Sequence, residues 1–255
     1  MIRVRGRAVV YGEVWFDEMP SQDAGVDIVV HRQRSAPVPD ARSTPFLTLR
    51  SDLAPTEDAL LRLCHENCRR RIKRADSRDR LQHEFTADVD GRLDEFAEFF
   101  DAFAKEKSIW PADRGWLAAA ARSRQLVLSA ARQGDKVLVW HAHLVAGDST
   151  RLEYSASKFR EEDADARALS GRANCWLHWQ DMRRLKALGL RWYDWGGMFE
   201  DESTPERAGI NRFKRGFGGR PDRRFDCSVP ATLRGRLWLP LRDTWRRFRD
   251  AGASA

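Results

Sequence analysis

The sequence predicts an α+β fold in which helices pack against a central, largely antiparallel sheet. Three short segments of alternating apolar residues follow one another closely between residues 125 and 157, which is typical of an antiparallel meander. Directly after them, Trp176, Trp179 and Met182 recur at three-residue spacing and predict a strong helix. A short strand, a loop and a last strand follow, and this alternation is the layout of an α+β domain.

The segment before residue 54 predicts strands joined by turns. Runs of β-branched or alternating residues indicate strands at residues 2–10, 14–16, 26–30 and 46–49. Residues 32–45 are polar and Pro-rich, which is typical of a loop. A helix should begin near Thr56 and run into a basic cluster made of Arg69, Arg70, Arg71, Lys73 and Arg74. We expect this cluster either to be solvated or to contact phosphate.

A second unit is expected to begin near Leu81 with a strand over residues 81–89. Four phenylalanines then recur at helical spacing and predict an amphipathic helix with an aromatic face, namely Phe96, Phe99, Phe100 and Phe103. A short helix is expected next, followed by the three meander strands, at residues 116–123, 125–131, 136–145 and 151–157. The helix after the meander should end at Gly189, and two further strands are expected at residues 191–195 and 222–229.

The composition excludes a disordered chain and favours a globular protein. Hydrophobic residues make up 42% of the chain and aromatic residues 10%, which supplies enough apolar surface for a core. No run approaches the roughly 20 apolar residues of a spanning helix, and the first 20 residues alternate apolar with charged side chains. We therefore expect a cytoplasmic protein with reduced cysteines.

The charge balance favours an anionic partner. The formal net charge is +7 and the pI is near 9.6. Such a balance suits RNA, a phosphate-bearing cofactor or a membrane surface.

Two clusters of metal-ligand residue types occur in the sequence, and neither predicts a metal. Cys64, His65 and Cys68 lie within one helical turn, but a structural zinc site normally requires a second such pair. His141 and His143 alternate on one strand and share a face, which suits a metal pair or a general base. We expect them to lie in the core or in a pocket wall, and we expect no metal.

The segment from Tyr193 to Gly219 carries the most specific pattern in the chain. It reads YDWGG, an acidic loop MFEDESTPERAG, and then INRFKRGFGG. This pattern resembles the signature of the FemAB family, in which a strand ending in two glycines precedes a variable loop and an RFK-x-x-FGG element. The matching positions are Tyr193, Asp194, Gly196, Gly197, Gly209, Ile210, Arg212, Phe213, Lys214, Phe217, Gly218 and Gly219. Upstream matches at Tyr154, Ser155, Ser157 and Arg172 extend the likeness to about residues 93–229.

The resemblance implies a GNAT-like fold with a reduced N-terminal half, because the chain is shorter than the enzymes that build peptidoglycan bridges. We accordingly expect a reduced GNAT-like subdomain, a catalytic domain and a basic amphipathic helix, over residues 1–80, 81–230 and 231–255. Members of the family transfer amino acids from aminoacyl-tRNA to peptidoglycan precursors. Some relatives act in polysaccharide pathways and use acyl-CoA as the donor.

The resemblance also implies roles for individual residues and places the family's active Phe-Lys pair on Phe213 and Lys214. Lys214 would stabilise the oxyanion that forms when an amine attacks an ester or thioester carbonyl. Substrate-binding roles fall on Arg212, Tyr154, Ser155, Arg172, Asp194, Gly196 and Gly197. Arg212 suits a phosphate because a guanidinium binds phosphate through two parallel hydrogen bonds. Asp194 suits a structural or orienting role, and the paired glycines allow a ligand to approach the backbone.

A further phosphate contact is expected at residues 170–174, which place one Gly and one Arg at the entrance of the helix predicted after the meander. Backbone amides at a helix entrance are unpaired and attract anions. The donor would be acyl-CoA or aminoacyl-tRNA, and both carry phosphate.

These expectations predict an acyl- or aminoacyltransferase whose acceptor is an amine of a cell-envelope glycan or peptidoglycan-type precursor. The alternatives are an acyl-CoA N-acyltransferase acting on a small molecule, and a non-catalytic RNA-binding or scaffold protein. Residues 234–250 interleave Trp238, Leu241, Trp245 and Phe248 with arginines. Such a helix suits either the inner face of an anionic membrane, near a lipid-linked acceptor, or packing on the domain.

Overall fold

The computed structural model describes residues 1–20, 25–158 and 163–241. The chain forms two compact units, one made of Met1–Phe46 with Arg223–Ala255 and the other of Leu47–Asp222. It passes between them within strands β4 (Arg42–Asp52) and β10 (Arg220–Pro230). Residues 47–80 thus belong to the second unit, whereas the sequence analysis expected a boundary near residue 80.

The smaller unit is a sheet with the strand order β1 (Ile2–Arg5), β2 (Val10–Trp15), β3 (Ile28–Arg34) and β10. The single strand expected over residues 2–10 is divided, because Gly6 N–H donates to the Val9 carbonyl at 2.9 Å and closes a turn. The loop expected over residues 32–45 is shorter, because β3 and β4 extend into it from both sides. Residues 233–241 are helical, and Trp238 donates to the Tyr11 hydroxyl at 2.8 Å.

The larger unit contains a mixed sheet with the strand order β4, β9 (Trp192–Gly197), β8 (Ser149–Ser157), β7 (Lys136–Ala146), β6 (Leu126–Gln133) and β5 (Gln82–Thr86). The run from β6 to β8 is the expected antiparallel meander. Strands β8 and β9 are parallel and are joined through a helix, which makes them a βαβ unit.

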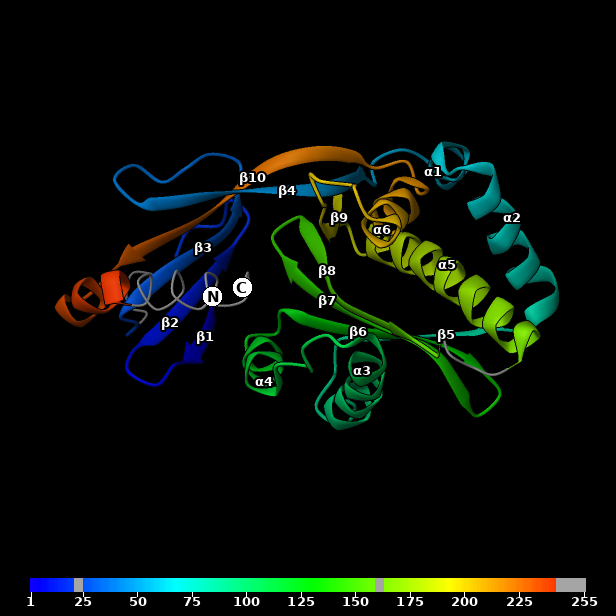
Figure 1. Ribbon diagram of the computed structural model, residues 1–255, viewed down its shortest axis with the longest axis horizontal. Coiled ribbons are helices and arrows are strands. Elements are labelled where there is room, and N and C mark those ends of the chain that lie inside the picture. The colour runs from blue at the N-terminus through cyan, green and yellow to red at the C-terminus, as the bar shows by residue number, and fades with distance from the viewer. Residues whose placement is uncertain (21–24, 159–162, 242–255) are drawn as a thin grey trace. The chain divides into compact units, whose positions relative to one another are not determined.

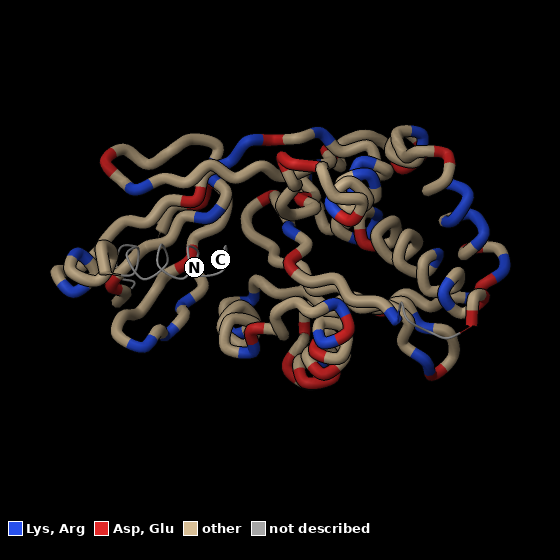
Figure 2. Tube along the Cα trace, in the orientation of Figure 1, with Lys and Arg blue, Asp and Glu red and all other residues tan. Residues whose placement is uncertain are grey.

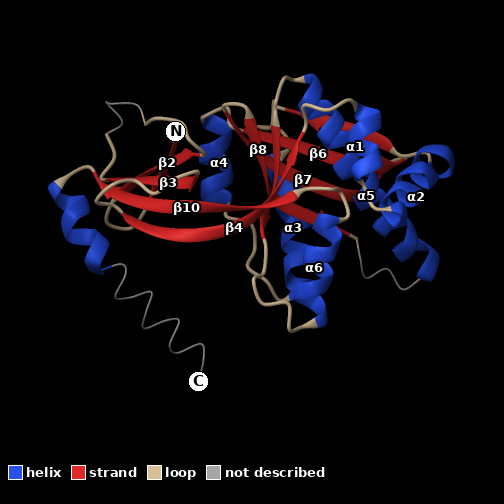
Figure 3. Cartoon of the chain, turned by 90° about the horizontal axis from the view of Figure 1, so that it is seen from above, coloured by secondary structure: helices blue, strands red, loops and turns tan. Residues whose placement is uncertain are grey.

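Helices cover both faces of this sheet (Figures 1 and 3). On one face, α3 (Leu93–Lys107) and α4 (Arg114–Arg122) lie against β6 to β8, and Phe96 of α3 contacts the Trp140 ring of β7 edge-on at 6.0 Å. On the other face lies α5 (Ala164–Ala187), whose Asp181 binds His141, the next residue of β7. Trp140 and His141 are adjacent in β7 and therefore face opposite helix layers, because successive side chains of a strand point to opposite faces of the sheet.

Three further helices complete the α5 layer, namely α1 (Glu57–Leu63), α2 (Glu66–Arg74) and α6 (Pro205–Arg215). The helix expected from Thr56 does begin there, with the Thr56 side chain accepting from Ala59 N–H at 3.3 Å. It does not run on, because Cys64 is extended and His65 caps a new helix by accepting from Asn67 N–H. Lys and Arg residues recur along α2 (Figure 2), and the short π-helix Ala75–Asp79 follows it.

The phosphate contact expected at residues 170–174 is wrong, because it assumed that these residues lie at the entrance of the helix. Helix α5 begins at Ala164 after the Asp163 cap, so these residues lie inside the helix and not at its entrance. Their backbone amides are used within the helix and are not available to an anion. Among the described residues, no helix is long and apolar enough to span a membrane.

Candidate active site

The carboxyl end of β9 lies where two parallel strands part. Strands β8 and β9 pair at Ser149, Thr150 and Arg151, and within the described residues this pairing goes no further than Arg151 opposite Asp194. Strand β8 remains paired with β7, and β9 remains paired with β4. In α/β arrangements the carboxyl ends of neighbouring parallel strands are the usual place for a ligand.

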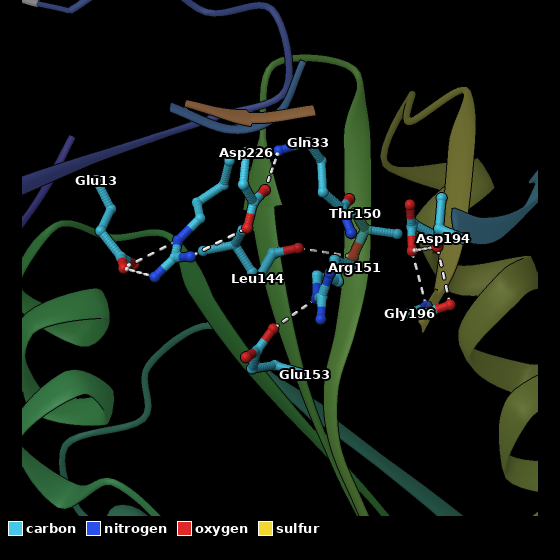
Figure 4. A network of polar contacts seen from close by, with 11 residues as sticks. Glu13, Gln33, Leu144, Thr150, Arg151, Glu153, Asp194, Gly196 and Asp226 are labelled. Atoms are coloured by element: carbon cyan, nitrogen blue, oxygen red, sulfur yellow. Dashed lines mark hydrogen bonds and ion pairs between the residues drawn. The ribbon is translucent and has the colours of Figure 1, made fainter. Parts of the chain in front are cut away.

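Buried contacts fix the turn at this end of β9 (Figure 4). Gly196 has φ +76, and its N–H donates to Asp194 Oδ1 at 2.7 Å. Thr48 Oγ1 lies 2.6 Å from the same carboxylate oxygen and 2.8 Å from the Gly196 carbonyl oxygen. Burial raises the pKa of Asp194, although Arg151 and these hydrogen bonds oppose the shift. Asp194 therefore orients the turn, and Gly196 is required there because a side chain at positive φ is strained.

Lys214 of α6 reaches this turn. Its Nζ donates to the Gly197 carbonyl at 2.6 Å, and a Cβ built on Gly196 would lie 4.0 Å from Nζ and 3.9 Å from Arg151 Nη2. Burial lowers the pKa of Lys214 to about 8; Asp194 opposes this shift and Arg151 adds to it. Arg151 is itself paired with Glu153 at 2.7 Å. Two cations, Lys214 and Arg151, thus flank the glycine turn, and the pKa of Lys214 lies close to neutral pH.

A second feature on α6 is an open pocket of about 700 Å³ between α2, α5 and α6. Arg71, Arg212 and Arg215 line it, together with Cys175 and Phe213. Its volume lies within the range of small-molecule sites, roughly 300–1,000 Å³. Lys214 does not line the pocket. Helix α6 therefore faces the pocket on one side and directs Lys214 toward β9 on another.

Three thiols cluster beside this pocket, and two of them, Cys68 and Cys175, line it. Cys68 forms side-chain hydrogen bonds with Cys64 and Cys175, and Arg71 Nη1 lies 3.8 Å from Cys175 Sγ. The hydrogen bond from Cys68 lowers the pKa of Cys175 to about 7; burial opposes the shift and Arg71 assists it. The sequence analysis placed Cys64 and Cys68 within one helical turn, whereas in the structure Cys64 follows α1 and Cys68 lies in α2, and both are buried. It did not connect either with Cys175, which lies more than a hundred residues later.

The pattern residues of α6 have different surroundings. Arg212 is exposed at the pocket rim, whereas Phe213 is partly buried against the core and its ring lies 5.5 Å from the ring of His178. The structure therefore brings together Lys214, Asp194, Gly196 and Gly197 around one turn, and it places Arg212 and Phe213 in the neighbouring pocket.

Three other predicted site residues lie elsewhere. Tyr154 faces α3 and α4; its ring contacts Phe100 at 4.8 Å and its hydroxyl accepts from Asp113 N–H at 3.3 Å. Burial raises the pKa of Tyr154 to about 12. Ser155 lies opposite His141 in the β7–β8 ladder. Arg172 is held by both carboxylate oxygens of Asp79, at 2.7 and 2.9 Å, and is not among the residues that line the pocket.

A buried polar cluster connects β5, β7 and α5. Asp181 Oδ2 lies 2.8 Å from His141 Nδ1 and 3.0 Å from His143 Nε2, and Oδ1 lies 3.0 Å from His83 Nε2. The His178 ring lies tilted against the His141 ring, with the ring centroids 4.1 Å apart. Burial alone would raise the pKa of Asp181, yet hydrogen bonds from the imidazoles hold it well below its ordinary value. Burial lowers the pKa of His143 and of His178.

Figure 4 also labels a network of the smaller unit. Arg32 binds Glu13 at 2.7 Å and Asp226 at 3.1 Å, and Asp226 accepts from Gln33 N–H at 2.9 Å. These contacts join β2, β3 and β10 and are structural.

Comparison with known proteins supports the fold. A protein-family model described as an acetyltransferase (GNAT) domain matches residues 62–215. The structure of FemX has a TM-score of 0.58 and 15% sequence identity, over 71% of this chain and 61% of FemX, so the chain spans less than two thirds of FemX. The C-terminal domain of a protein described as a lysylphosphatidylglycerol synthetase from Agrobacterium fabrum has a TM-score of 0.53 and 12% identity, over 89% of this chain and 82% of that domain. At such identities the likeness shows the fold alone. Curated proteins gave no match.

Proposed function

Because the chain belongs to the acetyltransferase (GNAT) domain family and is an acyltransferase, we propose that it transfers an acyl or aminoacyl group to an amine at the carboxyl end of β9. The amine nitrogen attacks the carbonyl carbon of the donor, a C–N bond forms, and the bond to the leaving sulfur or oxygen breaks. The amine loses one proton and the leaving group gains one. The enzyme must align the two reactants and stabilise the negative charge that develops on the carbonyl oxygen.

The observation that carries this proposal is the Lys214 ammonium beside the Gly196–Gly197 turn. The Gly197 carbonyl uses one of the three N–H donors of Lys214, and the group is partly buried, where a charge acts more strongly than in water. Lys214 thus supplies a fixed cation for the oxyanion, with Asp194 holding the turn in place.

For the donor, we propose acyl-CoA whose phosphates lie in the pocket between α2, α5 and α6 and whose acyl end extends past α6 to Lys214. Arg71 and Arg212 supply cations for its phosphates, and the pocket volume of about 700 Å³ suits a small molecule. Acyl-CoA is also the general donor of the GNAT fold. An aminoacyl-tRNA is the competing donor, favoured by the FemAB resemblance and by the basic charges along α2.

For the acceptor, we propose the amine of a cell-envelope glycan or peptidoglycan-type precursor. The resemblance around residues 193–219 and the fold likeness to FemX support this choice, as does the net charge of +7, which suits a phosphate-linked acceptor. A small-molecule amine is the alternative.

Two measurements test the proposal. Thermal shift with coenzyme A, acetyl-CoA and charged tRNA should show stabilisation by the donor, because a ligand that binds only the folded state raises its stability. Arg212→Ala should weaken that shift, whereas Arg207→Ala, which removes an α6 arginine paired with Asp201, should not. Stabilisation by tRNA alone would replace acyl-CoA as the donor, and no response to any donor would refute the pocket assignment.

A further inference from the structure

The buried cluster around Asp181 has the chemistry of a metal site, and the acyl-transfer proposal makes no use of it. His141, His143 and Asp181 each offer one ligand atom, and these atoms lie within 4.8 Å of one another. All three side chains are fully buried. They come from β7 and α5, two elements packed in the core, so the atoms are held in place before any ion binds.

The separations suit coordination. With metal–ligand bonds of about 2.0–2.1 Å, two ligand atoms lie about 2.9 Å apart at a right angle and about 3.3 Å apart at a tetrahedral angle. Asp181 Oδ2 lies 2.8 Å from His141 Nδ1 and 3.0 Å from His143 Nε2. The third pair, His141 Nδ1 and His143 Nε2, lies within 4.8 Å, so side-chain shifts of up to about an ångström reach tetrahedral geometry.

The surrounding residues orient these ligands. His141 Nε2 lies 3.2 Å from Asn174 Oδ1, which can accept from Nε2–H when Nδ1 gives its lone pair to a metal ion. Without an ion, the 2.8 Å contact between His141 Nδ1 and Asp181 Oδ2 is a hydrogen bond, and the ion replaces its proton. His83 Nε2 lies 3.0 Å from the second oxygen, Asp181 Oδ1. Such outer contacts are the usual supports of histidine and carboxylate ligands.

We propose that His141 Nδ1, His143 Nε2 and Asp181 Oδ2 bind a Zn²⁺ ion that ties β7 to α5. Imidazole and carboxylate ligands suit Zn²⁺, and the ion offsets a carboxylate buried in the core. A water molecule fills the fourth position. Because the site is enclosed, the ion stabilises the fold and does not meet the substrate. The sequence did not predict this site, since Asp181 lies 40 residues from His141 and joins it only through the fold.

The first test uses the wild-type protein. After expression with added zinc and purification without chelator, elemental analysis should find one zinc ion per chain. Removal of the ion should lower the melting temperature, and zinc should restore it. Replacement by Co²⁺ should give visible d–d bands without the thiolate charge-transfer band that cysteine ligands would add.

Variants then locate the ion. Asp181→Asn should lower zinc affinity at least about a hundredfold, and Asn174→Ala about ten- to a hundredfold. His31→Gln is a matched control, because it replaces another buried histidine in the other unit, and it should retain the zinc. Cys68→Ser tests the thiol cluster as the competing ligand set and should also retain it. A wild-type chain that binds neither zinc nor cobalt would overturn the proposal, as would zinc that survives Asp181→Asn and is lost in Cys68→Ser.

Discussion

Raising the pH should remove the charge on Lys214 and slow the reaction in a range where an ordinary lysine would still be protonated. Burial lowers the pKa of Lys214 to about 8, against an ordinary value of 10.5. About nine tenths of the Lys214 side chains are then charged at pH 7, half at pH 8 and about one tenth at pH 9. If the ammonium stabilises the oxyanion, kcat at saturating donor should fall about tenfold from pH 7 to pH 9 through this group.

Substitutions separate the charge from the structure. Lys214→Ala should lower kcat about a hundred- to a thousandfold, or about 3–4 kcal/mol, as the loss of one oxyanion donor does. Lys214→Arg should be slow, because the wider guanidinium cannot occupy the same position, but its rate should no longer fall near pH 8. Lys186→Met is the matched control, since Lys186 also donates to a backbone carbonyl at 2.6 Å, that of Leu53.

The assay is the initial rate with one amine acceptor between pH 6 and about pH 10, so that titration of the acceptor affects all variants equally. A descending limb near pH 8 that persists in Lys214→Arg would refute the reasoning. So would a folded Lys214→Ala variant within a few fold of wild-type activity.

Stability gives a second readout of the same group. Lys214 is partly buried and donates to the Gly197 carbonyl, so its replacement should change the stability of the fold. Because the folded pKa lies below the unfolded one, the unfolded chain binds more protons between about pH 8 and 10.5. The stability of the wild type relative to Lys214→Met should therefore rise with pH in that window, by at most about 3 kcal/mol. Urea unfolding at several pH values measures this difference, and a flat difference would contradict the lowered pKa.

The remaining predictions concern the donor, the thiols and the C-terminal segment. Arg212→Ala should raise the donor KM more than it lowers kcat. Arg172→Ala should leave the donor KM unchanged and lower the stability of the fold, because Asp79 loses its partner. A raised donor KM in Arg172→Ala with unchanged stability would restore the phosphate role of Arg172. Cys175 should be alkylated with a pH midpoint of about 7, and saturating acyl-CoA should slow the reaction if both occupy one pocket; an unaffected rate would place the donor elsewhere. Deleting residues 242–255 should weaken binding to anionic liposomes without unfolding the chain, and equal binding by both forms would exclude a membrane role.

The truncation begins at residue 242 so that the helix over residues 233–241 stays in place. Of the amphipathic helix expected over residues 234–250, Trp245 and Phe248 lie outside the described residues. Trp238 is described, and it packs beside the small cluster of Val9 and Ile28 and donates to Tyr11. Removing Trp238 would therefore disturb the smaller unit and confuse a binding result with a folding one.

The elements that the sequence predicts well are those whose signals are local. The antiparallel meander follows from alternation in its own strands, and the helix after it from the spacing of Trp176 and Trp179. The glycine turn at the end of β9 is predicted by the adjacent residues Gly196 and Gly197. The elements that it misplaces depend on local backbone conformation. Nothing in the letters of residues 64–68 marks Cys64 as extended, and His65 caps a new helix where the sequence predicts a single continuous one.

The site is less predictable because its members are distant in the chain. Thr48 and Asp194 are separated by 146 residues, and His83 and Asp181 by 98. No spacing rule connects such positions, since the fold alone brings the strands together. The resemblance supplied Lys214, Asp194 and the glycines, but it gave no indication of Thr48.

The contacts of Thr48 change the role of the N-terminal segment. Thr48 pairs with Gly197 in the β4–β9 ladder, and its hydroxyl lies beside both Asp194 Oδ1 and the Gly196 carbonyl. The Gly197 carbonyl, which accepts from Lys214 Nζ, thus belongs to a residue that β4 holds in position. A strand that the sequence assigned to a separate, reduced subdomain therefore forms one wall of the proposed active site. The geometry around Lys214 depends on it, because without β4 the turn loses both its ladder partner and the hydroxyl that donates to one of its buried oxygens.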